Sequence, residues 1–290
     1  MKSINKTMIE HAIKIARAVK ANSFLVCVDI SPDIATLAEE IKKITGVIIV
    51  TREDEELSED INKFAKRLDI PNVNLTRMGK IKIAIAKGIV LGFFKKGDKI
   101  VCLSGVPKFG YADSIIVIDV GKEFEILTSD FISDVLEAIQ PEVFNAVLNL
   151  ACELAAQGRE YRKVGTIFVL GDDDKVMQLS QQMIINPFLG YPEEQLNILN
   201  PELEETIKEF SAIDGAFIIK ENGVLVTAGR HLNAAPDSRD LPAGLGSRHI
   251  AAAGITSVTK AAAIVVSESS GNVSVFKNGK LFVTIEKPVE

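Results

Sequence analysis

The segment DGAFIIKENGVLV, residues 214–226, places a strand beside a tight turn and decides the fold of the second half of this chain. The run from Ala216 to Lys220 is predicted to be a β-strand, and Asn222-Gly223 is the kind of pair that two-residue hairpin turns favour. We therefore predict a β-hairpin over residues 218–226. The small residues of Asp214-Gly215-Ala216 would let a ligand approach the strand backbone closely, with the carboxylate beside it.

Two further motifs follow at the edges of predicted elements. Gly246-Ser247-Arg248-His249 precedes a helix predicted over 249–254, so backbone N–H groups, a hydroxyl, a guanidinium and an imidazole could converge on phosphate. Ser267-Glu268 ends the apolar run 261–266, a predicted central strand, and Glu268 would emerge where sheet ligands usually bind. Together with Asp214, these motifs indicate a nucleotide site.

The rest of the second half is predicted to complete a mixed sheet. Its further elements are a helix over 131–157 interrupted at Gln140-Pro141, a strand over 165–170, a helix around 176–183 and a hairpin over 275–283. Asp172-Asp173-Asp174 could suggest a metal site. A solvated turn that caps the following helix is the better interpretation, because adjacent carboxylates point in different directions and a helix N-terminus favours negative charge.

The first half alternates helical patterns with short β-branched runs, which predicts an α/β domain with a mostly parallel sheet. The predicted strands are 24–28, 47–50, 100–103 and 115–120. A helix is predicted over 34–45, with Ser31 as N-cap, Pro32 in its first position and Gly46 after its end. The boundary falls near 123–130, which gives two domains, 1–125 and 126–290.

Composition narrows the class of function. With 290 residues, of which 47% are hydrophobic, the chain can bury two cores. A net charge of -6 and a pI near 5.3 offer no basic face for nucleic acid or an acidic membrane, so we expect small-molecule chemistry. No apolar run reaches the roughly 18 residues of a membrane span, and a cytoplasmic protein is expected. Cys27, Cys102 and Cys152 are isolated in apolar runs and are predicted to be reduced core thiols.

The order and spacing of the three motifs resemble the catalytic domain of the diadenylate cyclases, enzymes that condense two ATP molecules into cyclic di-AMP. The likeness covers roughly residues 211–285 and implies a nucleotidyltransferase. The bacterial pattern has a second arginine where this chain has Ile250, and Arg230 or Lys260 could replace it. The first half is similar to the archaeal branch of the family. Its segment 97–107 and the strand after it resemble the C-terminal domain of pyruvate kinase, which implies an oligomerisation or ligand-sensing role.

The resemblance also implies roles for individual residues. Asp214 would activate the ribose 3′-hydroxyl, directly or by holding a divalent metal, and Asp214, Arg248 and His249 are the candidate catalytic residues. Asp214 and Glu268 would bind the metal, Mn²⁺ or Mg²⁺, which match oxygen ligands. The candidate ATP-binding residues are Gly215, Ala216, Leu232, Gly246, Ser247, Arg248, His249 and Ser267, with Leu232 packing on adenine from a loop over 230–232. His249 could act as a protonated phosphate ligand, a neutral donor or a metal ligand.

The reaction needs two nucleotides, so the resemblance implies a homodimer or larger homo-oligomer whose catalytic domains face one another, each with one ATP. Neither a nucleic-acid nor a membrane partner is expected. Two alternatives stay open: a non-catalytic sensor of ATP or cyclic di-AMP, and nucleotidyl transfer to another acceptor. The carboxylate of Asp214 argues against the sensor, because an anionic ligand gains nothing from a negative charge nearby.

Overall fold

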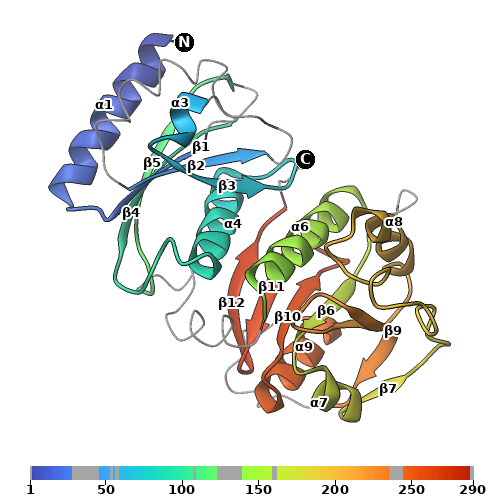
Figure 1. The fold of residues 1–290 in the computed structure, drawn as a ribbon. Coiled ribbons are helices and arrows are strands. Elements are labelled where there is room, and N and C mark those ends of the chain that lie inside the picture. The colour runs from blue at the N-terminus through green and yellow to red at the C-terminus, as the bar shows by residue number, and fades with distance from the viewer. Residues whose placement is uncertain are drawn as a thin grey trace. The chain divides into compact units, whose positions relative to one another are not determined.

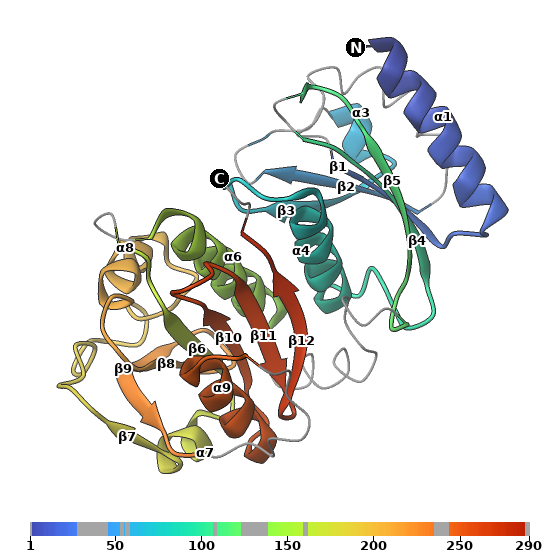
Figure 2. The same cartoon turned by 180° about the vertical axis from the view of Figure 1, so that it is seen from behind.

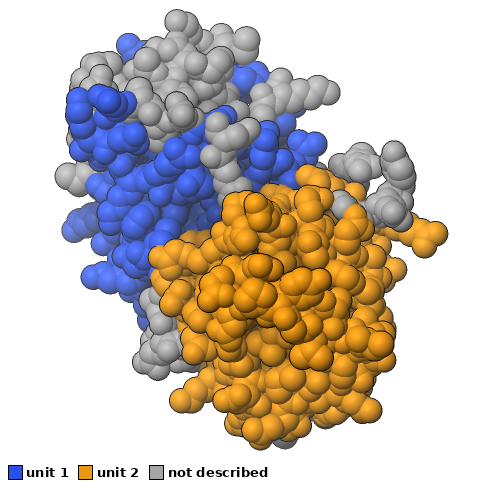
Figure 3. All heavy atoms as spheres, turned by 45° about the vertical axis from the view of Figure 1, so that its right-hand side comes forward, with its two compact units in different colours: residues 1–129 blue, residues 130–290 orange. Residues whose placement is uncertain are grey.

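The computed structural model describes residues 2–27, 46–52, 55, 59–106, 109–122, 139–158, 162–234 and 244–287. The chain divides into two compact units, Met1–Ser129 and Asp130–Glu290, coloured separately in Figure 3. The helix predicted over 34–45, the first part of the helix predicted over 131–157 and the predicted boundary at 123–130 lie outside the described residues.

Unit 1 is built on a five-stranded sheet in the order β3-β2-β1-β4-β5 (Figure 1). Its strands are β1 (Ser23–Cys27), β2 (Val47–Arg52), β3 (Lys66–Ile70), β4 (Lys99–Ser104) and β5 (Ser114–Asp119). The first four are parallel and β5 is antiparallel to β4, so the prediction of a mostly parallel sheet is confirmed. The segment between β4 and β5 is too short for a crossover helix, which explains the reversed direction of β5.

Helices cover both faces of this sheet (Figures 1 and 2). The helices of the unit are α1 (Lys2–Ala18), the short α3 (Glu59–Asn62) and α4 (Arg77–Val90). Ile9 and Ile13 of α1 pack on Phe24 and Val26 of β1, whereas α4 covers the opposite side, where Cys27 and Cys102 are buried. The sequence analysis did not predict β3, KRLDI, because the buried residues of this edge strand alternate with charged ones.

Unit 2 contains a seven-stranded mixed sheet in the order β12-β11-β10-β6-β8-β9-β7. Its strands are β6 (Thr166–Leu170), β7 (Ser180–Gln182), β8 (Ala216–Ile219), β9 (Leu225–Leu232), β10 (Ala262–Val266), β11 (Val273–Lys277) and β12 (Lys280–Ile285). Only β6 and β8 pair in parallel among the described strands of this sheet. The mixed sheet is therefore confirmed, as are the predicted hairpins at Asn222-Gly223 and Asn278-Gly279.

Two long helices sandwich this sheet. The helices of the unit are α6 (Pro141–Gln157), α7 (Asp173–Gln178), α8 (Pro201–Phe210) and α9 (Ser247–Val258). Ala252 and Ile255 of α9 pack on Val169, Ile218 and Val265, which point to one face because alternate strand residues face opposite ways. Figures 1 and 2 show α6 over the other face. No described helix of either unit is long and apolar enough to cross a bilayer.

The structure corrects two predictions in unit 2. The helix predicted around 176–183 ends at Gln178, and β7 follows it, because Gln182 pairs with Arg230 of β9. The segment 230–232 is the end of β9 rather than a loop, since all three residues pair with β7 and Arg230 also pairs with Ala216 of β8. The acidic turn does start α7: Asp173 lies in its first turn, and Asp172 Oδ2 accepts a bond of 2.7 Å from the Lys260 N–H.

Candidate active site

The three motifs meet at one end of the central strands of the unit 2 sheet. Thr166, which starts β6, pairs with Val266 at the end of β10, and Ile167 pairs with Ala216 at the start of β8. Asp214 lies just before β8 and Glu268 just after β10. The two strands that flank β6 therefore present carboxylates at the same end of the sheet, beside the start of β6. Sequence spacing alone could not show this, because the strands lie apart along the chain.

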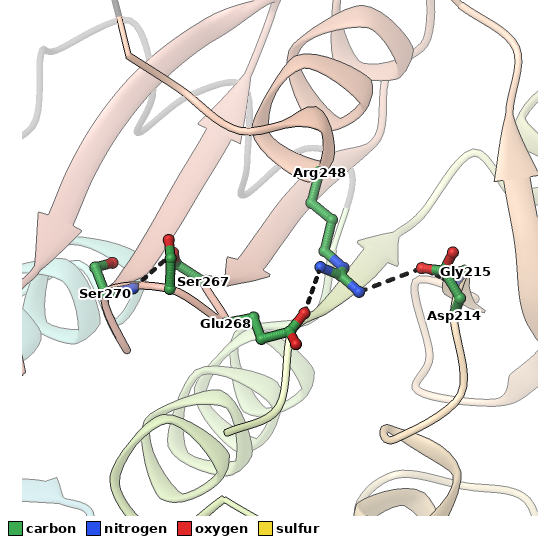
Figure 4. Close-up of polar contacts among 7 residues, drawn as sticks. Asp214, Gly215, Arg248, Ser267, Glu268 and Ser270 are labelled. Atoms are coloured by element: carbon green, nitrogen blue, oxygen red, sulfur yellow. Dashed lines mark hydrogen bonds and ion pairs between the residues drawn. The ribbon is translucent and has the colours of Figure 1, made fainter. Parts of the chain in front are cut away.

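Arg248, the second residue of α9, joins these carboxylates (Figure 4). Its Nη2 lies 3.2 Å from Asp214 Oδ1, and its Nη1 lies 3.1 Å from Glu268 Oε2. The Arg248 side chain is only 28% exposed, whereas those of Asp214 and Glu268 are 81% and 57% exposed. Arg248 Nε is buried without a hydrogen-bond partner among the described residues. The guanidinium therefore orients two carboxylates that are open to solvent.

Gly165, directly before β6, makes room for this cluster. A Cβ at this position would lie 2.8 Å from Arg248 Nη1 and 2.8 Å from Glu268 Cβ, closer than real Cβ contacts. Gly165 was predicted only as the start of the strand over 165–170 and not as a site residue. A glycine immediately before a buried strand was the available signal, because it often marks close approach of another group.

A cavity of about 620 Å³ opens beside the cluster, within the usual size range of ligand sites. The residues that line it are Arg162, Lys163, Gly246, Ser247, Arg248, His249, Ser267, Glu268 and Ser269. Gly246 is the N-cap of α9 and supplies no side chain to cap it, so the first N–H groups of the helix remain available to an anion. The predicted phosphate motif thus lines a cavity with Glu268.

His249 is buried, with only 8% of its surface exposed, although it lines the cavity. Its ring packs edge-on against Phe276, with 5.9 Å between the ring centroids. Burial lowers the pKa of His249 below its ordinary value, because the charged imidazolium loses water. Of the three roles considered for this side chain, the protonated phosphate ligand is therefore disfavoured.

Ser267 begins a tight turn at the cavity wall. Its carbonyl accepts a bond of 2.8 Å from the Gly271 N–H, and its hydroxyl lies 3.3 Å from that of Ser269. The Ser270 N–H also points at the Ser267 hydroxyl, at 3.4 Å (Figure 4). The turn thus presents hydroxyls and Glu268 at the cavity.

Three predicted ATP-binding residues do not line this cavity. Gly215 has a φ of +113°, and a Cβ there would lie 2.7 Å from the Gly229 carbonyl carbon, so its missing side chain serves the packing of β8 against β9. Ala216 and Leu232 are 0% and 6% exposed and belong to the core beneath α9. Nucleotide contacts by these three residues stay predictions.

Neither residue suggested as a substitute for the arginine absent at Ile250 reaches the cavity lining. The guanidinium of Arg230 donates to the carbonyls of Met177 and Ser180, each at 2.7 Å, and thus ties β9 to the end of α7. Lys260 follows the opposite end of α9. The cavity instead contains two cations that sequence reasoning missed, Arg162 and Lys163, which belong to no recognised motif.

The carboxylates fit a divalent metal only in part. No group of three or more His, Cys, Asp or Glu side chains is placed to hold an ion within the described part of the chain. Asp214 and Glu268 are hard oxygen donors of the kind that Mg²⁺ and Mn²⁺ accept, with substrate phosphates completing the ligand set. Asp214 Oδ1 already accepts from Arg248 and from the Gly215 N–H, which leaves Oδ2 for such a role.

Comparison with protein families matches both units. Residues 153–281 match the family described as DisA bacterial checkpoint controller nucleotide-binding, and residues 5–128 match the probable sensor domain DacZ_P. Among solved structures, DacA from Staphylococcus aureus is 27% identical over 48% of this chain and 84% of that chain, with a TM-score of 0.31. A pyruvate kinase from Cryptosporidium parvum is 13% identical over 40% of this chain and 22% of that chain, with a TM-score of 0.31. The pyruvate kinase likeness therefore stays a prediction.

Curated relatives match different shares of the chain, and one of them matches nearly all of it. A diadenylate cyclase of Methanocaldococcus jannaschii is 34% identical over 96% of this chain and 95% of its own length. A diadenylate cyclase of Haloferax volcanii is 34% identical over 71% of this chain and 75% of its own length. The cyclic di-AMP synthase CdaA of Bacillus subtilis is 46% identical over 23% of this chain and 24% of its own length. The chain therefore belongs to the diadenylate cyclase family.

Proposed function

We propose that this protein is a nucleotidyltransferase that condenses two ATP molecules into cyclic di-AMP and releases two pyrophosphates. Similarity to archaeal diadenylate cyclases over most of the chain supports this activity. The observation that carries the proposal is the cluster of Asp214, Arg248 and Glu268 beside a cavity at the N-terminus of α9.

The cavity can orient the triphosphate of one ATP. N–H groups in the first turn of α9 and the hydroxyls of Ser247 and Ser267 would donate to phosphate oxygens. Phosphoryl transfer depends mainly on positioning and on stabilisation of phosphate charge, and these donors supply both at a fixed place. The proposed role of these residues is therefore to hold the α-phosphorus in line for attack.

Asp214 is the proposed residue for the ribose 3′-hydroxyl. The incoming oxygen must lose its proton as it bonds to phosphorus, and a carboxylate without an assisting cation is a weak base for a hydroxyl group. Mn²⁺ or Mg²⁺, held by Asp214, Glu268 and phosphate oxygens, would supply Lewis acidity that favours the alkoxide and neutralises phosphate charge. Arg248 fixes the direction of both carboxylates, which is why its loss should affect binding and rate together.

The second nucleotide would come from a second copy of the chain. One cavity accommodates one ATP, and a symmetric product needs each 3′-oxygen to attack the α-phosphate of the opposite nucleotide. We therefore infer a homodimer or larger homo-oligomer in which two such cavities face one another.

The test is incubation of the purified protein with ATP and Mn²⁺ or Mg²⁺, followed by mass analysis of the nucleotides. Cyclic di-AMP and pyrophosphate are expected from the wild type. Asp214→Asn should abolish product formation with a modest loss of ATP affinity, whereas Asp174→Asn, the same change at an exposed position outside the cavity lining, should not. Unchanged ATP with both metals, from folded and oligomeric protein, would favour the alternative of a nucleotide sensor.

A further inference from the structure

The recognised motifs supply too little positive charge at the cavity to bind a triphosphate. Arg248 faces two carboxylates, so the cluster of Asp214, Arg248 and Glu268 carries more negative than positive charge. Such a cluster alone would repel a triphosphate. The burial of His249, which lowers its pKa, removes the other titratable cation of the motif.

Two cations outside the motifs lie in the wall of the same cavity. Arg162 and Lys163 are both exposed residues of the segment that enters β6, and both line the cavity together with Ser247 and Ser267. Lys163 Nζ donates to the Ser269 carbonyl at 3.3 Å, which holds it beside the turn that contains Glu268. Their ammonium and guanidinium groups can give the cavity a surplus of positive charge.

Two glycines allow close packing next to these cations. Gly158, which ends α6 with a φ of +64°, lies so close to the Arg162 carbonyl that a Cβ would be 2.2 Å from the oxygen. On the other side, Gly165 packs beneath Arg248 and Glu268. Arg162 therefore packs against the end of α6, and Gly165, two residues after Lys163, packs against the charged cluster, while the side chains of Arg162 and Lys163 are exposed.

We propose that Arg162 and Lys163 bind the β- and γ-phosphates of ATP and supply the positive charge that the cluster of Asp214, Arg248 and Glu268 lacks. This inference rests on the proposed function, because it assigns a partner to the pyrophosphate part of the substrate. Ile250 itself is 44% exposed and is not among the residues that line the cavity. Guanidinium and ammonium groups form charge-assisted bonds to phosphate, and an arginine can form two in parallel.

Only ligands with β- and γ-phosphates should depend on Arg162 and Lys163 for binding. ATP carries the β- and γ-phosphates, whereas AMP and cyclic di-AMP lack them. Removal of the two cations should therefore weaken the binding of ATP selectively, and the remaining ATP affinity should depend less on ionic strength because fewer charge contacts are left to screen.

The experiment measures equilibrium binding of α,β-methylene-ATP, AMP and cyclic di-AMP to the full-length Arg162→Gln/Lys163→Gln protein by calorimetry. Affinity for α,β-methylene-ATP should fall about tenfold to a hundredfold, and affinity for the other two should change less than about threefold. The matched control is Lys260→Gln/Lys280→Gln, which removes two exposed cations of the same unit outside the cavity lining. Arg162→Lys/Lys163→Arg keeps the charge and should retain most of the affinity.

An ATP-analogue affinity equal to that of the control variant would overturn the proposal, and so would an equal loss for all three ligands. Arg162→Gln alone tests the same point if the double variant fails to fold, because Arg162 is exposed and its loss leaves no buried gap. Failure of the proposed function gives a different result. In that case the wild type binds the analogue but forms no cyclic di-AMP from ATP, and the phosphate assignment is still tested by binding.

Discussion

Gly165 is the residue whose missing side chain lets the charged cluster form. A methyl group there would meet Arg248 Nη1 and Glu268 Cβ, each at 2.8 Å. We predict that Gly165→Ala displaces the guanidinium from the two carboxylates and lowers the rate of cyclic di-AMP formation about tenfold to a hundredfold, because small misplacements of catalytic groups are costly. Steady-state rates and thermal unfolding should be measured on the same preparations.

A control separates this effect from crowding in general. Gly88 of α4 is also tightly packed, since a Cβ would lie 2.3 Å from Cε2 of Phe94 in unit 1. Gly88→Ala should lower the unfolding temperature and leave the rate per folded molecule near that of the wild type. A wild-type rate in Gly165→Ala would contradict the role given to Gly165.

His249 gives the second prediction at this scale. Its folded pKa lies below the ordinary value of 6.5, so the unfolded chain binds a proton more readily than the folded one. Stability from this residue is present above about pH 6.5 and is lost as the pH falls toward the lower folded pKa. His249→Gln should therefore flatten the pH dependence of the free energy of unfolding between about pH 5 and 7, measured by urea denaturation.

His11 provides the comparison, because it is exposed on α1 and its exchange for Gln removes a histidine without changing a buried one. If His11→Gln and His249→Gln gave the same dependence on pH, the burial argument would fail.

At the residue scale, the sequence predicted a common site for Asp214, Arg248 and Glu268, but not the ion pairs between them or the residues around them. Asp214, Arg248 and Glu268 were predicted to share a site because each motif lies at the edge of a predicted element. Arg162, Lys163 and Gly165 were not found, because a charged pair and a glycine before a strand are common and acquire meaning only through the cavity that sheet pairing creates.

Among the elements, α6 and α8 are joined by Lys208. Its Nζ lies 2.8 Å from Glu153 Oε2 of α6, contacts Glu204 and lies 3.3 Å from Glu205 Oε1. Burial opposes the charge of Lys208, but hydrogen bonds to Glu153 and Glu204 outweigh it and raise its pKa. Burial also raises the pKa of Glu153. The lysine therefore compensates a half-buried carboxylate that would otherwise be costly.

We predict that Lys208→Met destabilises the protein by about 2 kcal/mol at pH 7, because a partly buried carboxylate loses its partner. The loss should shrink as the pH falls and Glu153 takes up a proton, since a group with a raised folded pKa favours the folded state at low pH. Urea denaturation at several pH values measures it. Lys220→Met, which removes a more exposed pair with Glu193, should cost less than about 1 kcal/mol, and equal losses would refute the argument.

Elements were predicted correctly where a local sequence signal specifies them. They were missed where pairing with a neighbouring strand determines the structure. Asn222-Gly223 and Asn278-Gly279 specify their hairpins locally, since both turns need residues that tolerate positive φ. β7 and the end of β9 have no such signal: they exist because the edge of the sheet offers hydrogen-bond partners, with Gly229 at φ +70° within β9. Tertiary context thus overrode the helical pattern after Gln178.

For the whole molecule, the cavity lies entirely within residues 162–269 of unit 2, whereas the reaction joins two nucleotides. A single chain can therefore bind ATP but should not complete the product. We predict that ATP affinity stays constant on dilution, whereas the rate of cyclic di-AMP formation per chain falls once the protein concentration drops below the dissociation constant of the assembly. Sedimentation and product analysis across the same dilution series measure both quantities. A rate per chain that remained constant after the protein had become monomeric would rule out facing cavities and would favour nucleotidyl transfer to a different acceptor.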